Sequence, residues 1–311
     1  MRPMAKPAEI FTPDEWERLR GVSNWKGLAL VGHAWGVIAL AMAASVIWPN
    51  PLVWLLAIMV IGCRQLGLAI LMHEAAHGLL HPNKKINDWV GQWLGAAPVG
   101  ADLHGYRTYH LSHHKNVQTD KDPDLGLSAP FPVTKASLRR KIVRDLTGQT
   151  FFKQRVGLFL ALANMGERGA AGLPPGAGGA VAKFLIVNLV LLALCVLAGA
   201  PGAFLIWLIA MATWFPLATR IRNIAEHACV TSTDDPFTHA RTTHANLLER
   251  AFIAPYWVNY HLEHHLFMYL PCYRLPAAHR LLAEKGLLEG REISPGYRDV
   301  LRRVVKVPVA A

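Results

Sequence analysis

The sequence has few charged residues and few cysteines. Only 17% of its 311 residues are charged, whereas soluble proteins average about a quarter. Together with a hydrophobic content of 52%, this excludes an intrinsically disordered chain, which needs low hydrophobicity and high charge. The four cysteines show no CxxC spacing, so neither a disulfide framework nor a thiolate metal site is indicated.

Acidic residues are fewer than basic residues, 21 against 32, which gives a net charge of +11. Such a balance is typical of proteins that meet nucleic acid or an anionic membrane surface. No nucleic-acid-binding motif is present, so we expect no nucleic-acid partner. The first 26 residues carry charges throughout and lack an apolar core, so we expect no secretory signal peptide.

Long apolar stretches are what the sequence does have. They cover residues 27–48, 51–72, 181–199 and 203–219. At 1.5 Å per residue, a helix of about 20 residues crosses a hydrocarbon core of about 30 Å. Short turns with proline separate the two members of each pair. The sequence therefore predicts an all-α integral membrane protein, with four transmembrane helices in two hairpins at 27–72 and 181–219.

The lysine and arginine residues predict the orientation of these helices. The two short turns carry none, and all but Arg64 lie outside the hairpins once Lys183 is counted at the membrane edge. By the positive-inside rule, the segments rich in basic residues are cytoplasmic. We therefore expect one domain over 1–311 with three cytoplasmic parts. These are an N-terminal segment, 1–26, and a helical cap formed by 73–180 and 220–311.

Histidine is the other outlier, with 15 residues. Three clusters stand out: HEAAH at 73–77 (box one), HLSHH at 110–114 (box two) and HLEHH at 261–265 (box three). Residues at i, i+3 and i+4 lie on one face of a helix, so box one presents two imidazoles to one side and the other boxes three each. Imidazole is a common ligand for iron, zinc and copper.

Depth in the membrane gives an independent constraint on these histidines. His73 lies about 33 Å along the second span, and His227 lies about 36 Å along the fourth if that helix continues. Both would then lie just past the inner edge of the hydrocarbon, where boxes two and three can also fold. A tetrahedral zinc needs four ligands, so nine histidines suit two metals better than one. The nine are His73, His77, His110, His113, His114, His227, His261, His264 and His265.

The same residues are compatible with two other functions, those of a zinc protease and of a membrane metal transporter. Box one matches the HExxH pattern of zinc proteases, in which Glu74 would be the general base. A protease would need one further ligand and would leave both HxxHH boxes unused. A membrane metal transporter with a histidine-rich cytoplasmic site predicts polar residues throughout the spans. The only such residues are His33, Arg64, Gln65 and Asn188.

The three boxes, in this order and spacing, resemble those of the membrane fatty acid desaturases. The resemblance extends to YHLEHHLF at 260–267, NKKINDWV at 83–90 and DKDPD at 120–124, and it covers most of residues 50–285. It implies a non-haem di-iron centre that activates O2 and removes hydrogen from an unactivated C–H bond. The implied ligands of the two iron ions are the nine histidines.

The resemblance also assigns residues around the ligands. Similar acyl-CoA desaturases have an Asn-x-x-x-His pair after the last span, which implies a ligand role for His227 and a weaker, water-mediated one for Asn223. Glu74, Glu226 and Glu263 each adjoin a ligand histidine. They would orient imidazole N–H groups, with a solvated charge as the alternative for each.

The implied reaction is O2-dependent desaturation of a long acyl chain, carried on a lipid or carrier, that enters from the membrane. The alternative on this scaffold is hydroxylation or ketolation of a carotenoid, alkane or sphingoid lipid. The family often carries a cytochrome b5 domain marked by His-Pro-Gly-Gly, which is absent from this sequence. Electrons would therefore come from a separate ferredoxin- or cytochrome-type donor, which the basic face could dock.

Several polar residues outside the boxes have open roles. We expect His33 to be a hydrogen-bonded histidine inside the membrane. Arg64 is costly there and should face the bundle interior, either lining the substrate path or pairing with a backbone carbonyl or Gln65. The aspartates of 120–124 suit a hard-cation site or, better, a turn and helix cap. Surface or interface positions are expected for the remaining histidines: His81, His104, His239, His244 and His279.

Overall fold

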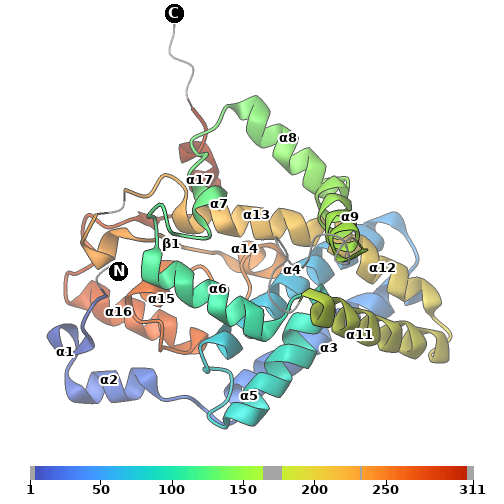
Figure 1. The fold of residues 1–311 in the computed structure, drawn as a ribbon, viewed down its shortest axis with the longest axis horizontal. Coiled ribbons are helices and arrows are strands. Elements are labelled where there is room, and N and C mark those ends of the chain that lie inside the picture. The colour runs from blue at the N-terminus through green and yellow to red at the C-terminus, as the bar shows by residue number, and fades with distance from the viewer. Residues whose placement is uncertain (1–3, 164–176, 232, 307–311) are drawn as a thin grey trace, which may run out of the picture.

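The computed structural model describes residues 4–163, 177–231 and 233–306, and these are built almost entirely from helices (Figure 1). Two short strands, β1 (Thr242–Thr243) and β2 (Ile293–Ser294), pair in parallel. The predicted helical class is therefore confirmed for the described part of the chain, apart from this small sheet.

In the described residues, four helical runs are long and apolar enough to cross a membrane. They are α3 (Lys26–Ile47), α4 (Pro51–Ala76), α11 (Ala177–Leu197), and α12 (Pro201–Ala212) continued by α13 (Trp214–His227). Their order and position match the four apolar stretches of the sequence. α11 begins earlier than residue 181, within a Gly-rich segment, 168–180, whose residues up to 176 lie outside the described part.

Two of these runs extend beyond their apolar stretches, as the predicted depths of His73 and His227 require. α4 continues to Ala76, with His77 as its C-cap, so box one lies at the end of this helix. The fourth run reaches His227 but breaks at Thr213, whose hydroxyl donates to the Ile209 carbonyl at 2.7 Å. Pro216 follows, and it has no amide to continue the helical pattern. The break therefore has a local cause in the sequence.

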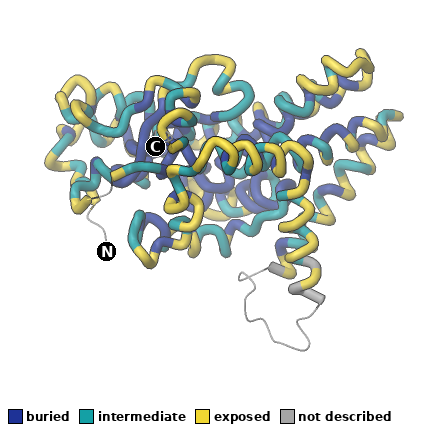
Figure 2. The backbone as a smooth tube through the Cα atoms, turned by 90° about the horizontal axis from the view of Figure 1, so that it is seen from above, coloured by how far each residue is buried: buried dark blue, intermediate teal, exposed yellow. Residues whose placement is uncertain are grey.

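The helix α4 is the centre of the fold. In its most apolar stretch 67% of the residues are buried, against 17% in α11. It packs against α3, α12 and α13. Figure 2 shows the buried residues gathered in the interior and the exposed ones along the outer helices. Leu189, Leu194 and Leu197 on α11 are exposed leucines of the kind that lipid would cover.

Shorter helices surround this core. Before residue 164 they are α1 (Pro7–Ile10), α2 (Pro13–Arg20), α5 (Lys84–Val90), the π-helical η1 (Gly91–Ala96), η2 (Ala97–Val99), α6 (Leu103–Asn116), α7 (Leu125–Ser128), α8 (Lys135–Leu146) and α9 (Gln149–Ala163). After residue 232 they are η3 (Pro236–Thr238), α14 (Leu247–Phe252), α15 (His261–Leu266), η4 (Cys272–Arg274), α16 (Leu275–Glu284) and α17 (Tyr297–Arg303).

The helix α6 carries box two and lies against the end of α4 (Figure 1). Its first turn is capped by Asp102, whose Oδ2 accepts a hydrogen bond from the Gly105 amide at 3.0 Å. The other carboxylate oxygen of Asp102 lies 2.7 Å from Nζ of Lys183 on α11. Asp102 starts α6, because a carboxylate at a helix N-terminus accepts hydrogen bonds from free amides. Through Lys183 it also joins α6 to α11.

Candidate metal centre

Box one lies at the end of α4, where side chains from neighbouring elements bind the last carbonyl groups. Arg107 on α6 donates from Nε to the Ala76 carbonyl at 2.9 Å and from Nη2 to the Ala75 carbonyl at 2.8 Å. Asn87 on α5 also donates to the Ala75 carbonyl, at 2.9 Å. The last carbonyls of a helix have no partner within it, so these contacts fix the end of α4 and join it to α6.

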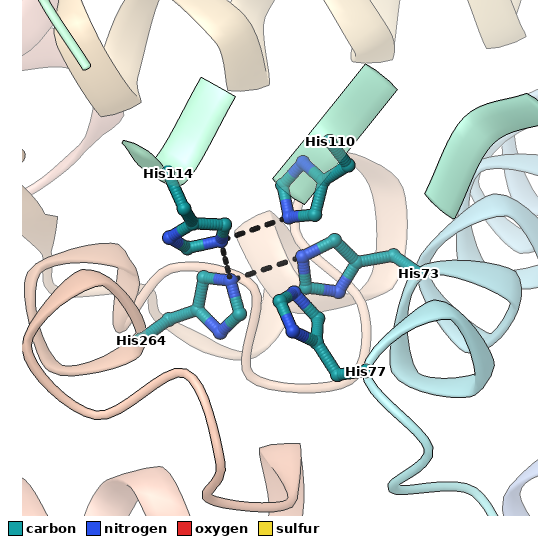
Figure 3. Close-up of side chains that lie close together, drawn as sticks. All are labelled: His73, His77, His110, His114 and His264. Carbon is teal, nitrogen blue, oxygen red and sulfur yellow. Dashed lines mark hydrogen bonds between the residues drawn. The ribbon is translucent and has the colours of Figure 1, made fainter. Parts of the chain in front are cut away.

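The nine predicted histidines come together in two groups. The five-histidine group contains His73, His77, His110, His114 and His264, and the four-histidine group contains His113, His227, His261 and His265. Within each group the candidate ligand atoms lie within 4.8 Å of one another. All of these side chains except His77 are buried. Figure 3 shows the rings of the first group, from α4, α6 and α15, facing one another.

In the five-histidine group the Nε2 atoms converge. Nε2 of His264 lies 3.0 Å from Nε2 of His73 and 3.0 Å from Nε2 of His114. Nε2 of His114 lies 2.9 Å from Nε2 of His110. The buried Nε2 of His77 has no hydrogen-bond partner among the described residues. A buried ring nitrogen without a partner is costly unless it binds something else, such as a metal ion.

In the four-histidine group the Nε2 atoms also lie close together. Nε2 of His261 lies 3.0 Å from Nε2 of His227 and 3.1 Å from Nε2 of His265. Nε2 of His113 lies 3.4 Å from Nε2 of His265. Imidazole nitrogens bind a metal such as zinc at about 2.0–2.1 Å, so two of them at right or tetrahedral angles lie about 2.9–3.4 Å apart. Both groups therefore have the spacing of nitrogens that share one ion.

The outward Nδ1 atoms of four of these rings face oxygen atoms. The partners are Oδ1 of Asp122 for His113 (2.7 Å), the His239 carbonyl for His227 (3.1 Å), Oε1 of Glu226 for His261 (3.3 Å) and Oε1 of Glu74 for His73 (3.4 Å). A neutral imidazole carries one proton, and an acceptor at Nδ1 keeps it there. The lone pair of each ring is then left on Nε2, which points into its group.

Burial favours the neutral form of six imidazoles of the boxes. Loss of solvent, with a smaller effect of the Arg107 charge, lowers the pKa of His77 to about 3. Burial, followed by repulsion from neighbouring imidazoles, also holds the pKa well below its ordinary value for five more rings: His110, His114, His261, His264 and His265. The neutral ring is the form that binds a metal.

Glu74, Glu226 and Glu263 differ in their contacts. Glu74 and Glu226 lie near an imidazole Nδ1 of the two groups, as described above. Glu263 contacts Nδ1 of His279 at 2.6 Å and the hydroxyl of Thr242 instead. The structure therefore places Glu263 where it joins α15 to α16 and β1.

Asn223 lies one turn before His227 on α13 and belongs to neither histidine group. Its Oδ1 accepts a hydrogen bond from Nη1 of Arg222 at 3.3 Å. With His227 and His261 it lines a cavity of about 30 Å³ beside the four-histidine group. A space of that size has room for about one water molecule.

Asp122 and His239 contact ligand histidines although neither is among the predicted site residues. Oδ1 and Oδ2 of Asp122 also accept the amides of Asp124 and Gln118, at 2.9 and 2.8 Å, so one carboxylate both shapes a turn and holds His113. His239 was expected at a surface or interface, but it is only 4% exposed. The DPD segment directly after box two was the available signal for Asp122, whereas His239 contributes a backbone carbonyl that no side-chain pattern marks.

Comparison with known protein families gives the same family as the three histidine boxes. The sequence model of the family described as "Fatty acid desaturase" matches residues 49–295, most of the chain. The chain belongs to the fatty acid desaturase family. It is therefore an oxidoreductase of the desaturase type, as the three boxes predicted.

Curated relatives of this desaturase differ in what they are named for. It is 26% identical over 292 residues to the dihydrorhizobitoxine desaturase of Bradyrhizobium elkanii, covering 89% of this chain and 78% of that protein. It is 33% identical over 105 residues to the beta-carotene ketolase of a Paracoccus species, or 32% and 40% of the two chains. A third relative, the sn-1 acyl-lipid omega-3 desaturase (ferredoxin) of a Synechocystis species, is 31% identical over 94 residues, or 29% and 25%. The match thus covers less than half of the last two proteins.

Proposed function

We propose that this protein desaturates a long acyl chain, carried on a lipid or another carrier, with O2 and external electrons. One iron ion would be held by the five-histidine group and a second by the four-histidine group. The observation that carries the proposal is the division of nine convergent imidazoles into two groups, each with the spacing of ligands on one ion. Neither group contains a carboxylate or thiolate, and imidazole suits iron with open positions.

Two iron ions in these positions would supply the activation of O2 that removal of hydrogen from an unactivated C–H bond requires. The protein's own contribution is to hold and shield them. Asp122, Glu226 and the His239 carbonyl keep the rings of His113, His261 and His227 in one tautomer and orientation. We assign Glu74 the same role toward His73, and Asn223 a weaker, water-mediated contact with the second ion.

The arrangement argues against zinc proteolysis. In an HExxH protease the glutamate activates a water on the metal. Here Oε2 of Glu74 accepts the Cys272 amide at 2.7 Å, and Oε1 lies 3.4 Å from the outward Nδ1 of His73. Both oxygens are therefore engaged away from the converging Nε2 atoms. The box one histidines also share their group with boxes two and three, which a protease would not use.

The membrane arrangement is part of the proposal. The four apolar runs form two hairpins, and the elements after the second and fourth spans form a cap on the cytoplasmic side, where the basic residues lie. The whole chain, 1–311, is one domain. Electrons come from a separate donor of the ferredoxin or cytochrome type, and the Synechocystis relative, which is named for ferredoxin, supports the ferredoxin alternative. Exposed arginines of α8, such as Arg139 and Arg140, offer an acidic donor a place to dock.

Metal analysis tests the centre directly. Purified protein should contain about two iron ions per chain, and His264→Ala should lower bound iron and abolish turnover, because Nε2 of His264 adjoins both His73 and His114. His104→Ala is the matched control, since His104 is exposed on α6 outside both groups. Full activity of His264→Ala, or one zinc per chain in the active protein, would contradict the proposal.

A second candidate reaction is favoured by the beta-carotene ketolase relative: hydroxylation or ketolation of a carotenoid, alkane or sphingoid lipid on the same scaffold. The two outcomes differ in the fate of oxygen. Desaturation reduces O2 to two water molecules with two electrons from the donor, two protons from solvent and two hydrogen atoms from the substrate. Hydroxylation leaves one oxygen atom in the product. Turnover under ¹⁸O₂ with mass spectrometry of the lipid products decides, because only an oxygenated product gains the label.

A further inference from the structure

A groove on the surface of α3 and α4, outside the metal centre, gathers basic side chains. It has a volume of about 510 Å³ and is closed on one side by α14 and the turn that follows it. Its polar lining consists of His33, Arg64, Arg250 and Tyr256, and its remaining walls are apolar except for backbone. None of the described residues that line it is acidic. The groove therefore combines positive charge with an apolar wall, and no acidic side chain among its described lining residues balances that charge.

Arg64 is the buried member of this lining. Its side chain is 7% exposed, and Nη2 donates to the carbonyls of Arg250 and Ala251 at 3.0 and 3.3 Å. These carbonyls belong to the last turn of α14, whose C-terminal end carries partial negative charge. Arg64 thus pairs with backbone carbonyls, which is one of the alternatives that the sequence leaves open, and it also lines this groove. Its Nε is buried and has no hydrogen-bond partner among the described residues.

The depth of Arg64 makes this free donor costly. Arg64 precedes His73 by nine residues on α4, which is about 13.5 Å along the helix axis. It therefore lies within the part of α4 that is apolar enough to cross a membrane. A cation at that depth is expensive and is normally paired with an anion or a carbonyl oxygen. Among the described residues, the partners of the Arg64 guanidinium are two carbonyls, the Cys63 sulfur and the Tyr256 ring, and none of them is an anion.

A turn at Tyr256 and Trp257 forms part of the groove. Tyr256 and Trp257 both have left-handed backbone conformations, with φ of 52° and 56°, which side chains of this size rarely adopt. The turn places the Tyr256 hydroxyl 3.0 Å from Nδ1 of His33 and its ring over Gly67, where an added Cβ would come within 2.6 Å of Cε2. Box three begins at His261, four residues after this turn. The turn that lines the groove is therefore followed closely in the chain by α15, which carries box three.

We propose that this groove binds the oxyanion end group, carboxylate or phosphate, of a single-chain amphiphile whose apolar tail lies on the membrane side. Arg64 supplies the buried charge, and the exposed side chains of Arg250 and His33 complete the ring of donors at the mouth. This inference rests on the proposed function, because it defines an anionic lipid as the class of substrate. It excludes a role of Arg64 confined to anchoring α14.

Equilibrium binding tests the groove without turnover. The iron-loaded protein is placed in phosphatidylcholine nanodiscs with no electron donor, and binding of hexadecanoate, hexadecyl phosphate and the uncharged hexadecanol is compared with empty nanodiscs. We expect at least one anion to bind more tightly than hexadecanol. Arg250→Gln should weaken anion binding about tenfold, as loss of one charged hydrogen-bond partner does, and leave hexadecanol unchanged. Its backbone carbonyl still accepts from Arg64, so α14 keeps its anchor.

The matched control is Arg18→Gln, which removes the same charge from an exposed position on α2. The preferred anion identifies the source, a free carboxylate or a lipid phosphate. Equal binding of both anions and hexadecanol, or an effect of Arg250→Gln no larger than that of Arg18→Gln, would overturn the inference. Failure of the proposed function would look different: iron absent or no product formed while the anion still binds.

Discussion

Asp122 and His113 form the closest contact between a carboxylate and an imidazole of the two histidine groups that the structure describes. Oδ1 of Asp122 lies 2.7 Å from Nδ1 of His113, and both side chains are buried. Burial raises the pKa of Asp122, but hydrogen bonds from His113, and from the Gln118 and Asp124 amides, outweigh it and lower that pKa below its ordinary value. The carboxylate therefore stays ionised and keeps Nε2 of His113 turned into the four-histidine group.

Replacing this carboxylate should weaken the second metal position. Asp122→Asn loses the charge and one of the acceptors, and partners of this kind are worth about 10–100-fold in metal affinity or activity. We expect a loss of that size in iron affinity, measured by chelator competition. Asp124→Asn is the control, because Oδ2 of Asp124 lies 3.7 Å from Nδ1 of His113. A similar loss in both variants would show that the turn matters rather than the contact.

The two groups should lose iron separately. His77 belongs only to the five-histidine group, and His265 only to the four-histidine group. Each of His77→Ala and His265→Ala should therefore reduce bound iron from about two ions to about one per chain, and the iron that remains should differ in its Mössbauer spectrum. Identical spectra from the two variants would mean that the histidines do not form two independent positions.

The close approach of α3 to the segment after box one should be sensitive to a single methyl group. A Cβ on Gly27 would lie 2.0 Å from the Leu80 carbonyl oxygen, which is backbone, whereas one on Gly32 of the same helix would meet nothing within 4 Å. Gly27→Ala should cost about 1–3 kcal/mol, as overpacking does. Gly32→Ala should be neutral or slightly stabilising. Thermal unfolding in detergent measures both, and equal melting temperatures would refute the predicted contact.

The start of α6 should stabilise the protein in a pH-dependent way. Burial raises the pKa of Asp102, but hydrogen bonds from Lys183 and from the Gly105 amide outweigh it and hold the pKa below its ordinary value of 3.8. A carboxyl with a lowered folded pKa stabilises above its ordinary pKa, and that stabilisation disappears as the pH falls through the folded pKa. Asp102→Asn, which can still cap the helix, should therefore be less stable than the wild type at pH 7.

Acid should close this gap. As the pH falls from about 4 through the lowered pKa of Asp102, the melting temperatures of the wild type and Asp102→Asn should converge, because the folded side chain then becomes protonated as well. The capping bond is common to both, so the difference between them reports the Lys183 pair. A gap that stays constant from pH 7 to pH 3 would show that the charge of Asp102 contributes nothing.

Sequence patterns determined much of this protein. Hydropathy located the four apolar runs, because a helix that crosses lipid must be apolar over a known length. Hydropathy alone does not mark the helix ends, because α4 and α13 continue beyond the apolar stretches to Ala76 and His227, as the depths of box one and His227 require. The start of α2 at Pro13 also has a local cause in the sequence, because Thr12 and Glu15 form a capping box.

Helical geometry also explains how the boxes divide. Residues four apart on a helix differ by about 40° in direction, whereas those three apart differ by about 60° to the other side. His110 and His114 accordingly share one group while His113 joins the other, and His261 and His265 share one group while His264 joins the other. The spacing HxxHH thus contains a two-plus-one division in each box.

Only the tertiary structure decided which boxes meet. The pair from box two joins box one and the single histidine of box three, while the pair from box three joins His227 and the single histidine of box two. That choice depends on how α4, α6, α13 and α15 cross. Contacts such as Arg107 to the end of α4 and Glu263 to His279 join these elements. Each joins residues whose proximity arises from packing, and the local patterns of a sequence record no such distances.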